Sequence, residues 1–150
     1  MNKDEVIKDV RKVFSTLSVI APFSYPLLMM PIVIRNDIKT WAGTNGVTFF
    51  VNPAEWDKLD FREKMFVAMH EWIHVVLQHA KRMQGRRHRI WNYACDYATN
   101  DMIMNEMEDH FTPPPGILLD QNFFYDKSAE EVYNMLIEMM DEKKNNDDRS

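Results

Sequence analysis

Apolar residues recur at helical spacing within the first eighteen positions of the chain. These residues are Ile7, Val10, Phe14 and Leu17. The pattern predicts an amphipathic helix over about 2–18. Asn2 followed by Glu5 resembles a capping box at its start. We expect an irregular apolar connector at 22–31, because it contains three prolines.

Two short apolar runs at Pro31–Ile34 and Val47–Val51 follow, and their composition predicts strands. The Asn45-Gly46 dipeptide between them favours a tight hairpin turn. We therefore expect a small β-hairpin in an otherwise helical chain.

The longest apolar region, about Phe61–Met83, is apolar on nearly every face. A helix of this kind is buried, so we predict a central helix here. Asp60 with Glu63 marks its start, and we expect Gly85 to end it. No glycine or proline interrupts the predicted helix.

Two further helices are predicted, over about Arg89–Met107 and from Ser128 to about Met140. The segment 141–150 has no apolar residue, and we expect it to be a disordered, charged tail. The expected organisation is one α+β domain over residues 1–140. It is mainly helical, with a small hairpin or sheet beside the central helix.

Composition changes this picture little. The chain has 150 residues, 45% hydrophobic and 27% charged, which is typical of a globular protein. Its net charge of −5 argues against a protein built to coat nucleic acid. The single cysteine, Cys95, cannot form an internal disulfide, and we interpret it as a small buried residue.

The uncharged stretch 13–34 is long enough to span a membrane, but its prolines would break a spanning helix repeatedly. The charged residues Lys3, Asp4 and Glu5 are also unlike the start of a secretory signal. We therefore expect a cytoplasmic protein with no membrane partner.

The sequence His70-Glu71-Trp72-Ile73-His74 places an HExxH pattern in the predicted central helix. Residues four apart share one helix face, so His70 and His74 can converge on one Zn²⁺ ion. Glu71 would then act as general base toward a zinc-activated water. The pattern predicts zinc-dependent hydrolysis of peptide bonds.

A catalytic zinc site needs a third protein ligand. Asp96 is the preferred candidate, because Asn92, Asp96 and Asn100 form a polar stripe on the next predicted helix. His79 is the alternative, but it would face away from His70 and His74 on a continuous helix. We expect His79 to play a supporting role, and Asn92 and Asn100 to hold the Asp96 carboxylate.

The segments HEWIHVVLQHAKR (70–82) and WNYACDYATN (91–100) resemble the HExxH metallopeptidase domain found before von Willebrand factor A-like domains in bacteria and as stand-alone phage proteins. That family is similar to minimal, gluzincin-like members of the zincin superfamily. The resemblance implies a zincin-like fold and a peptide or protein substrate. It also implies His70 and His74 as ligands, Glu71 as base and Asp96 as third ligand. Zincins carry an edge strand before the metal helix, so we expect 47–51 to bind extended substrate.

The basic run Lys81–Arg89 leaves a second function open. It could bind nucleic acid through phosphate contacts, although a solvated turn between helices is the preferred interpretation. The alternative function is thus a catalytically silent zincin-fold protein that binds a protein partner or nucleic acid.

Overall fold

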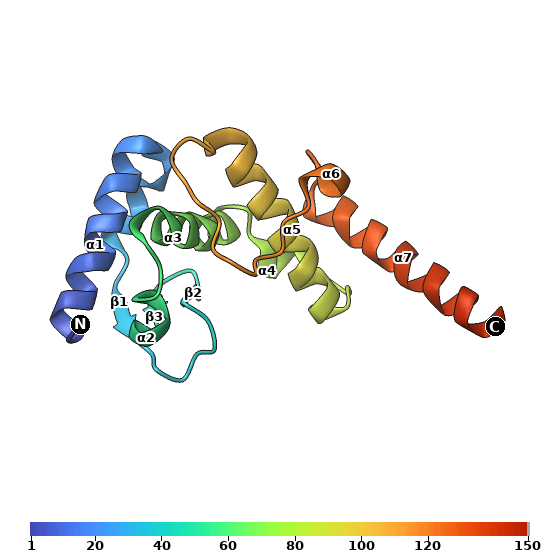
Figure 1. Ribbon diagram of the computed structural model, residues 1–150, viewed down its shortest axis with the longest axis horizontal. Coiled ribbons are helices and arrows are strands. Elements are labelled where there is room, and N and C mark those ends of the chain that lie inside the picture. Colours follow the sequence, from blue (N-terminus) through green and yellow to red (C-terminus); the bar gives the residue numbers. More distant parts are fainter. Residues whose placement is uncertain (150) are drawn as a thin grey trace.

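The computed structural model describes residues 1–149 and has a mainly helical α+β architecture with one small sheet. The long helices are α1 (Lys3–Ile20), α3 (Phe61–Val76), α5 (His88–Met107) and α7 (Ala129–Arg149). Figure 1 shows α3 between α1 and α5, with α7 extending away from the other helices. The short helices are η1 (Pro22–Met29, a 3₁₀ helix), α2 (Pro53–Trp56), α4 (His79–Arg82) and α6 (Gln121–Phe124).

Side-chain caps start three of the long helices where the sequence predicts them. Asn2 caps α1, and Asp60 forms a complete capping box with Glu63 at α3. Ser128 and Glu131 exchange side-chain-to-backbone hydrogen bonds at the start of α7. Each pair satisfies backbone N–H groups that have no partner within the helix.

The proline-rich segment after α1 is more regular than expected, because it forms η1 instead of an irregular connector. Pro22 stands in the first turn of η1, where a missing N–H costs no hydrogen bond. No helix in the described part of the chain combines the length and apolarity needed to cross a membrane.

The sheet differs from the predicted hairpin. Its strands β1 (Ile32–Ile34), β2 (Ala42–Thr44) and β3 (Phe49–Val51) lie in the order β1-β3-β2. The Asn45-Gly46 turn does close a hairpin, but it joins β2 to β3, and β1 pairs with β3 in parallel. The sequence did not predict β2, because Ala-Gly-Thr has little intrinsic preference for a strand.

The predicted role of 47–51 as an edge strand is therefore wrong, because β3 is the central strand. Its backbone is paired with β1 on one side and β2 on the other. Within this sheet, a free edge remains on β1 and on β2, and β2 is the strand that packs against α3.

The predicted central helix ends early and changes direction. α3 stops at Val76, Gln78 adopts a left-handed conformation (φ 54°, ψ 42°), and α4 begins at His79. Left-handed backbone is costly for a residue other than glycine, so contacts elsewhere must hold it. Arg82 supplies one, because its guanidinium donates to the carbonyl oxygen of Leu77 at 3.0 Å.

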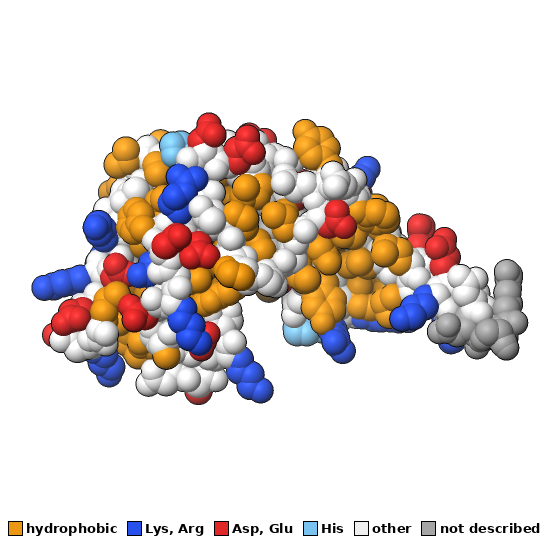
Figure 2. All heavy atoms as spheres, viewed as in Figure 1, with side chains coloured by type: hydrophobic (Ala, Val, Ile, Leu, Met, Phe, Trp, Pro, Cys, Tyr) orange, Lys and Arg blue, Asp and Glu red, His pale blue; other side chains and the backbone are white. Residues whose placement is uncertain are grey.

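Two apolar clusters form the core. The larger joins α1, the sheet and α3, and its largest fully buried side chains include Phe14, Phe49, Trp56 and Phe66. The smaller joins α5 to α6 and α7 around Trp91. Figure 2 shows apolar side chains gathered at the surface near α6 and the start of α7, where Phe123 and Tyr125 are exposed.

The segment expected to be a disordered tail continues α7 as helix to Arg149, while Ser150 lies outside the described residues. Residues 141–144 are Asp, Glu, Lys and Lys, and lysine and glutamate have high helix propensity. They extend a helix whose earlier turns are already formed and packed on α5, so no new nucleation is needed.

One buried ion pair ties α1 to α3. The Lys64 ammonium lies 2.8 Å from Asp9 Oδ2, which also accepts a hydrogen bond from Trp56 Nε1 at 2.9 Å. Burial raises the pKa of the Asp9 carboxyl, but the hydrogen bonds from Lys64 and Trp56 outweigh it and lower the pKa below its usual value.

We expect Asp9→Ala to lower the free energy of unfolding by about 2–4 kcal/mol, because the Lys64 ammonium would remain buried without a countercharge. The double variant Asp9→Ala/Lys64→Met should lose less, since it also removes the uncompensated charge. Urea unfolding of both variants measures the difference, and equal losses would contradict this account.

Candidate metal centre

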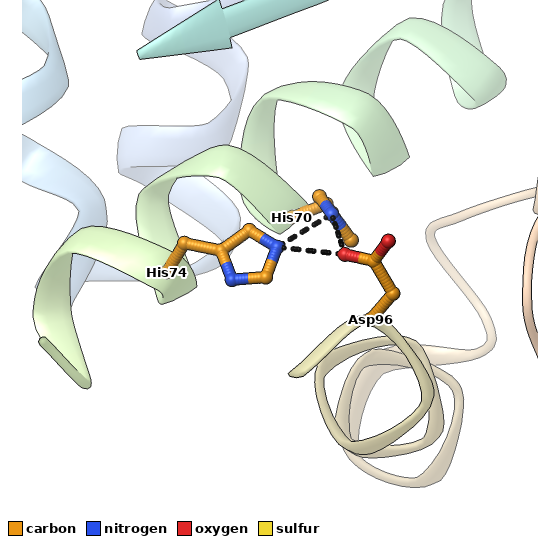
Figure 3. Close-up of side chains that lie close together, drawn as sticks. All are labelled: His70, His74 and Asp96. Carbon is orange, nitrogen blue, oxygen red and sulfur yellow. Dashed lines mark hydrogen bonds and ion pairs between the residues drawn. The ribbon is translucent and has the colours of Figure 1, made fainter. Parts of the chain in front are cut away.

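His70, His74 and Asp96 form a compact cluster between α3 and α5 (Figure 3). The two Nε2 atoms lie 2.7 Å apart, and Asp96 Oδ1 lies 3.2 Å from that of His70 and 3.1 Å from that of His74. The potential ligand atoms all lie within 4.8 Å of one another. In the described part of the chain, this is the group of His, Cys, Asp and Glu side chains arranged to hold a metal ion.

The two helices explain this convergence. One turn of α3 separates the histidines, so both rings project from the same face. α5 packs against α3 and presents Asp96 from the opposite side. Burial raises the pKa of the Asp96 carboxyl, but hydrogen bonds with both imidazoles outweigh it and hold the pKa well below its usual range.

Asn100 orients His70. Its Oδ1 lies 2.6 Å from His70 Nδ1, and its Nδ2 donates to the carbonyl oxygen of Leu118 at 2.9 Å. Because an amide oxygen only accepts, Nδ1 of His70 must carry a proton. With Nδ1 protonated, Nε2 of His70 donates to Asp96 when the ring is charged, and it carries the lone pair that a metal would need when the ring is neutral.

The prediction that Asn100 holds the Asp96 carboxylate is therefore wrong, since Asn100 contacts His70 instead. Asn92 does not hold that carboxylate either. Its side chain is exposed, and among the described residues it makes no side-chain hydrogen bond. The four-residue spacing correctly identified a polar stripe, but spacing does not show which group each member contacts.

His79 contacts His74 from the side away from the cluster. The turn at Gln78 brings Nδ1 of His79 to 2.7 Å from Nδ1 of His74. Trp91 Nε1 donates to the carbonyl oxygen of His79 at 2.7 Å. Burial and the proximity of His74 lower the pKa of His79 to about 3. A neutral His79 can accept a hydrogen bond from His74 Nδ1–H, and a neutral His74 ring then has its lone pair on Nε2, the atom beside Asp96.

This contact overturns the expectation of a continuous helix through His79, although it agrees with a supporting role for that residue. With the proton of the pair on His74, His79 carries its own proton on Nε2. That atom is buried and has no hydrogen-bond partner in the described structure. A buried N–H group without a partner has lost its hydrogen bonds to water, so the packing around His79 must offset that cost in free energy.

Glu71 lies next to the cluster without joining it. Its side chain is partly buried and makes no hydrogen bond within residues 1–149. Burial raises the pKa of its carboxyl to about 7; nearby Asp96 adds to the rise and His70 opposes it. Glu71 can therefore exchange a proton near neutral pH.

Two cavities meet at this cluster, with volumes of about 450 Å³ and 830 Å³. Glu71, His74 and Asp96 line both. The loop residues Gly116, Ile117 and Leu118 line the smaller one, so the proline-rich break after α5 borders the cleft. Cavities of this size accommodate small molecules or parts of peptides.

The basic run has a partly structural role. Arg82 Nε donates to Glu130 of α7 at 3.1 Å, and Arg86 donates to the carbonyl oxygen of Arg82 at 2.9 Å. The Arg86 guanidinium also lies 5.2 Å from the centre of the Trp91 ring. Cys95 is buried as predicted, and burial raises the pKa of its thiol to about 12.

A family model described as "Putative metallopeptidase domain" matches residues 12–150. No curated protein and no solved structure matches the chain.

We expect the metal-free protein to lose stability between about pH 4.5 and pH 7 through Glu71. Its folded-state pKa of about 7 exceeds the ordinary value of 4.5, so the folded state binds the proton more tightly than the unfolded chain does. Relative to wild type, Glu71→Gln should gain about 2 kcal/mol at pH 8 and almost nothing at pH 4. Urea unfolding in the presence of a chelator tests this, and an equal gain at both pH values would refute it.

Proposed function

The chain belongs to the metallopeptidase domain family, and on that premise we propose that it is a zinc-dependent peptidase with a zincin-like fold. In this proposal His70, His74 and Asp96 bind zinc, and Glu71 is the general base. The convergence of two imidazole Nε2 atoms and one carboxylate oxygen beside the partly buried Glu71 carries the proposal.

The donor set fits zinc. Imidazole nitrogen and carboxylate oxygen are common zinc ligands, and three protein ligands leave a coordination position for catalysis. Asn100 favours the tautomer of His70 that leaves Nε2 available to a metal, and His79 is compatible with the same tautomer of His74. His79 fits less well as a ligand, because its Nδ1 faces His74 Nδ1 on the side away from Asp96.

Bound zinc would supply a Lewis acid that polarises the scissile carbonyl and makes a water molecule more acidic. Glu71 takes a proton from the water molecule as the water oxygen attacks the carbonyl carbon. Glu71 then delivers the proton to the amine nitrogen as the carbon–nitrogen bond breaks. In the metal-free protein, burial raises the pKa of the Glu71 carboxyl to about 7, so this group binds a proton more readily than an ordinary glutamate does.

An extended peptide can bind along β2. This strand has a free edge in the sheet and packs against α3, which carries His70 and His74. Backbone hydrogen bonds to a free strand edge bind peptides without demanding a particular sequence. The edge predicted for 47–51 is thus reassigned to the neighbouring strand.

The alternative function is a catalytically silent protein that binds a protein partner or nucleic acid through Lys81–Arg89. Lys81, Arg87, His88 and Arg89 are exposed and support it. The pairing of Arg82 with Glu130 and the stacking of Arg86 on Trp91 weaken it, because these arginines are already engaged.

We expect purified protein to bind about one zinc ion per chain at neutral pH and to cleave peptides. Glu71→Gln should retain the zinc and lose at least about a hundredfold in activity, because it removes the base and no ligand. Metal analysis and a peptide cleavage assay measure both properties. Glu138→Gln, the same change on an exposed position of α7, should have no effect. Full activity in Glu71→Gln would exclude Glu71 as the base, whereas zinc-loaded wild-type protein that cleaves no peptide would support the silent alternative.

The ligand assignment predicts a rank order of zinc affinities. Asp96→Ala should weaken zinc binding by more than about tenfold, because it removes a ligand. His79→Leu should weaken it by about tenfold, because it removes the hydrogen bond that orients His74. His79→Asn should recover part of that loss, since its amide oxygen can accept from His74 Nδ1. Competition with a chromogenic chelator measures these affinities. Normal zinc affinity in Asp96→Ala together with a severe loss in both His79 variants would make His79 the ligand.

A further inference from the structure

The two cavities that meet at Glu71, His74 and Asp96 differ in chemical character. The smaller has an apolar wall made of Trp41, Phe66, Val67, Ile117 and Leu118. Phe66 and Val67 belong to the buried core of α3, so that part of the wall has a fixed shape. Trp41, Ile117 and Leu118 come from segments outside the helices and are only partly buried. An apolar side chain that entered here would complete their burial.

The larger cavity lies between the hairpin turn and the connection from α4 to α5. Asn45, Gln78 and Asn92 contribute polar groups to its lining. Glu71, His74 and Asp96 line this cavity at the cluster. Its other ionisable lining residues are Cys95 and three basic residues, His79, Lys81 and His88.

Lys81 and His88 are available to a ligand at this end of the cleft. Both side chains are exposed, and neither makes a hydrogen bond or ion pair within the described residues. The neighbouring Arg82 and Arg86, by contrast, are held by Glu130 and by the Trp91 ring. Lys81 and His88 are therefore unpaired basic groups in a chain of net charge −5, which favours an anionic ligand at this end of the cleft.

We propose that the cleft selects peptides with a bulky apolar side chain on one side of the scissile bond and an acidic side chain on the other. This inference rests on the proposed peptidase function and adds the substrate class to it. The apolar side chain occupies the pocket of Trp41, Phe66 and Leu118, and the carboxylate lies beside Lys81 and His88. Free nucleic acid is the competing ligand for the basic end, and its binding is an outcome of the test.

The first experiment measures cleavage preference. Zinc-loaded wild-type protein is incubated with a library of peptides, and the products are sequenced by mass spectrometry. We expect a Leu, Met or Phe residue on one side of the cleaved bond and enrichment of Asp or Glu on the other. Loss of the apolar residue should lower cleavage by about tenfold or more, as is usual for an apolar specificity pocket.

The second experiment assigns each preference to its residues. Lys81→Glu should reverse the acidic preference toward Lys and Arg and leave the apolar preference intact. Leu118→Asn should weaken the apolar preference and leave the acidic preference intact. Lys8→Glu makes the same charge change on the exposed face of α1 and should alter neither. The acidic preference should weaken as salt is added, because exposed charges are screened.

A binding measurement separates this inference from the proposed function. Zinc-loaded Glu71→Gln is titrated with a fluorescent peptide of the preferred sequence and with its variant lacking the acidic residue, and a short oligonucleotide is then added as competitor. Cleavage that shows no acidic preference, or a preference that Lys81→Glu leaves unchanged, overturns the inference and leaves the peptidase function standing. Displacement of the peptide by low concentrations of the oligonucleotide assigns the basic end to nucleic acid. Peptides that are neither cleaved nor bound overturn both proposals.

Discussion

Burial of ionisable groups on one helix is the constraint on which this structure depends. His70, Glu71 and His74 project from α3, a helix whose other faces form much of the core. Such groups are costly to bury unless hydrogen bonds or opposite charges compensate them. The structure supplies Asp96 from α5, Asn100 against His70, and His79 against His74. The arrangement that provides partners for the two histidines is also the one that directs both Nε2 atoms toward one point.

The turn at Gln78 links this centre to the rest of the chain. It allows His79 to face His74, and it depends on Arg82, which donates to the Leu77 carbonyl and pairs with Glu130 of α7. α7 therefore supports the orientation of His74 although it contributes no residue to the cluster. Arg82 of the basic run belongs to this support, and Arg86 donates to its carbonyl oxygen.

The cleft combines two environments around one reactive centre. Its apolar part is formed by side chains from the core face of α3, from the segment before β2 and from the loop after α5, whereas its basic part comes from α4 and the first residue of α5. A change of direction after α3 thus creates both the support for His74 and the polar half of the cleft.

The sequence by itself determined the elements whose causes are local. Capping residues and apolar periodicity were enough to predict the starts of α1, α3 and α7, and the Asn45-Gly46 turn closes a hairpin as predicted. The spacing of His70 and His74 determined that they share a helix face, and the stripe through Asp96 and Asn100 marked the helix that meets them.

Only the tertiary structure decided the features that depend on distant partners. The left-handed residue Gln78 is unfavourable in isolation and needs a carbonyl contact from Arg82, so no local signal announces the end of α3. The pairing of β1 with β3 and the strand character of Ala42–Thr44 depend on neighbours across the sheet, not on propensity. Asn100 likewise contacts His70 because of how α5 crosses α3, and the direction of a side chain across such a crossing is set by packing, which spacing along one helix does not encode.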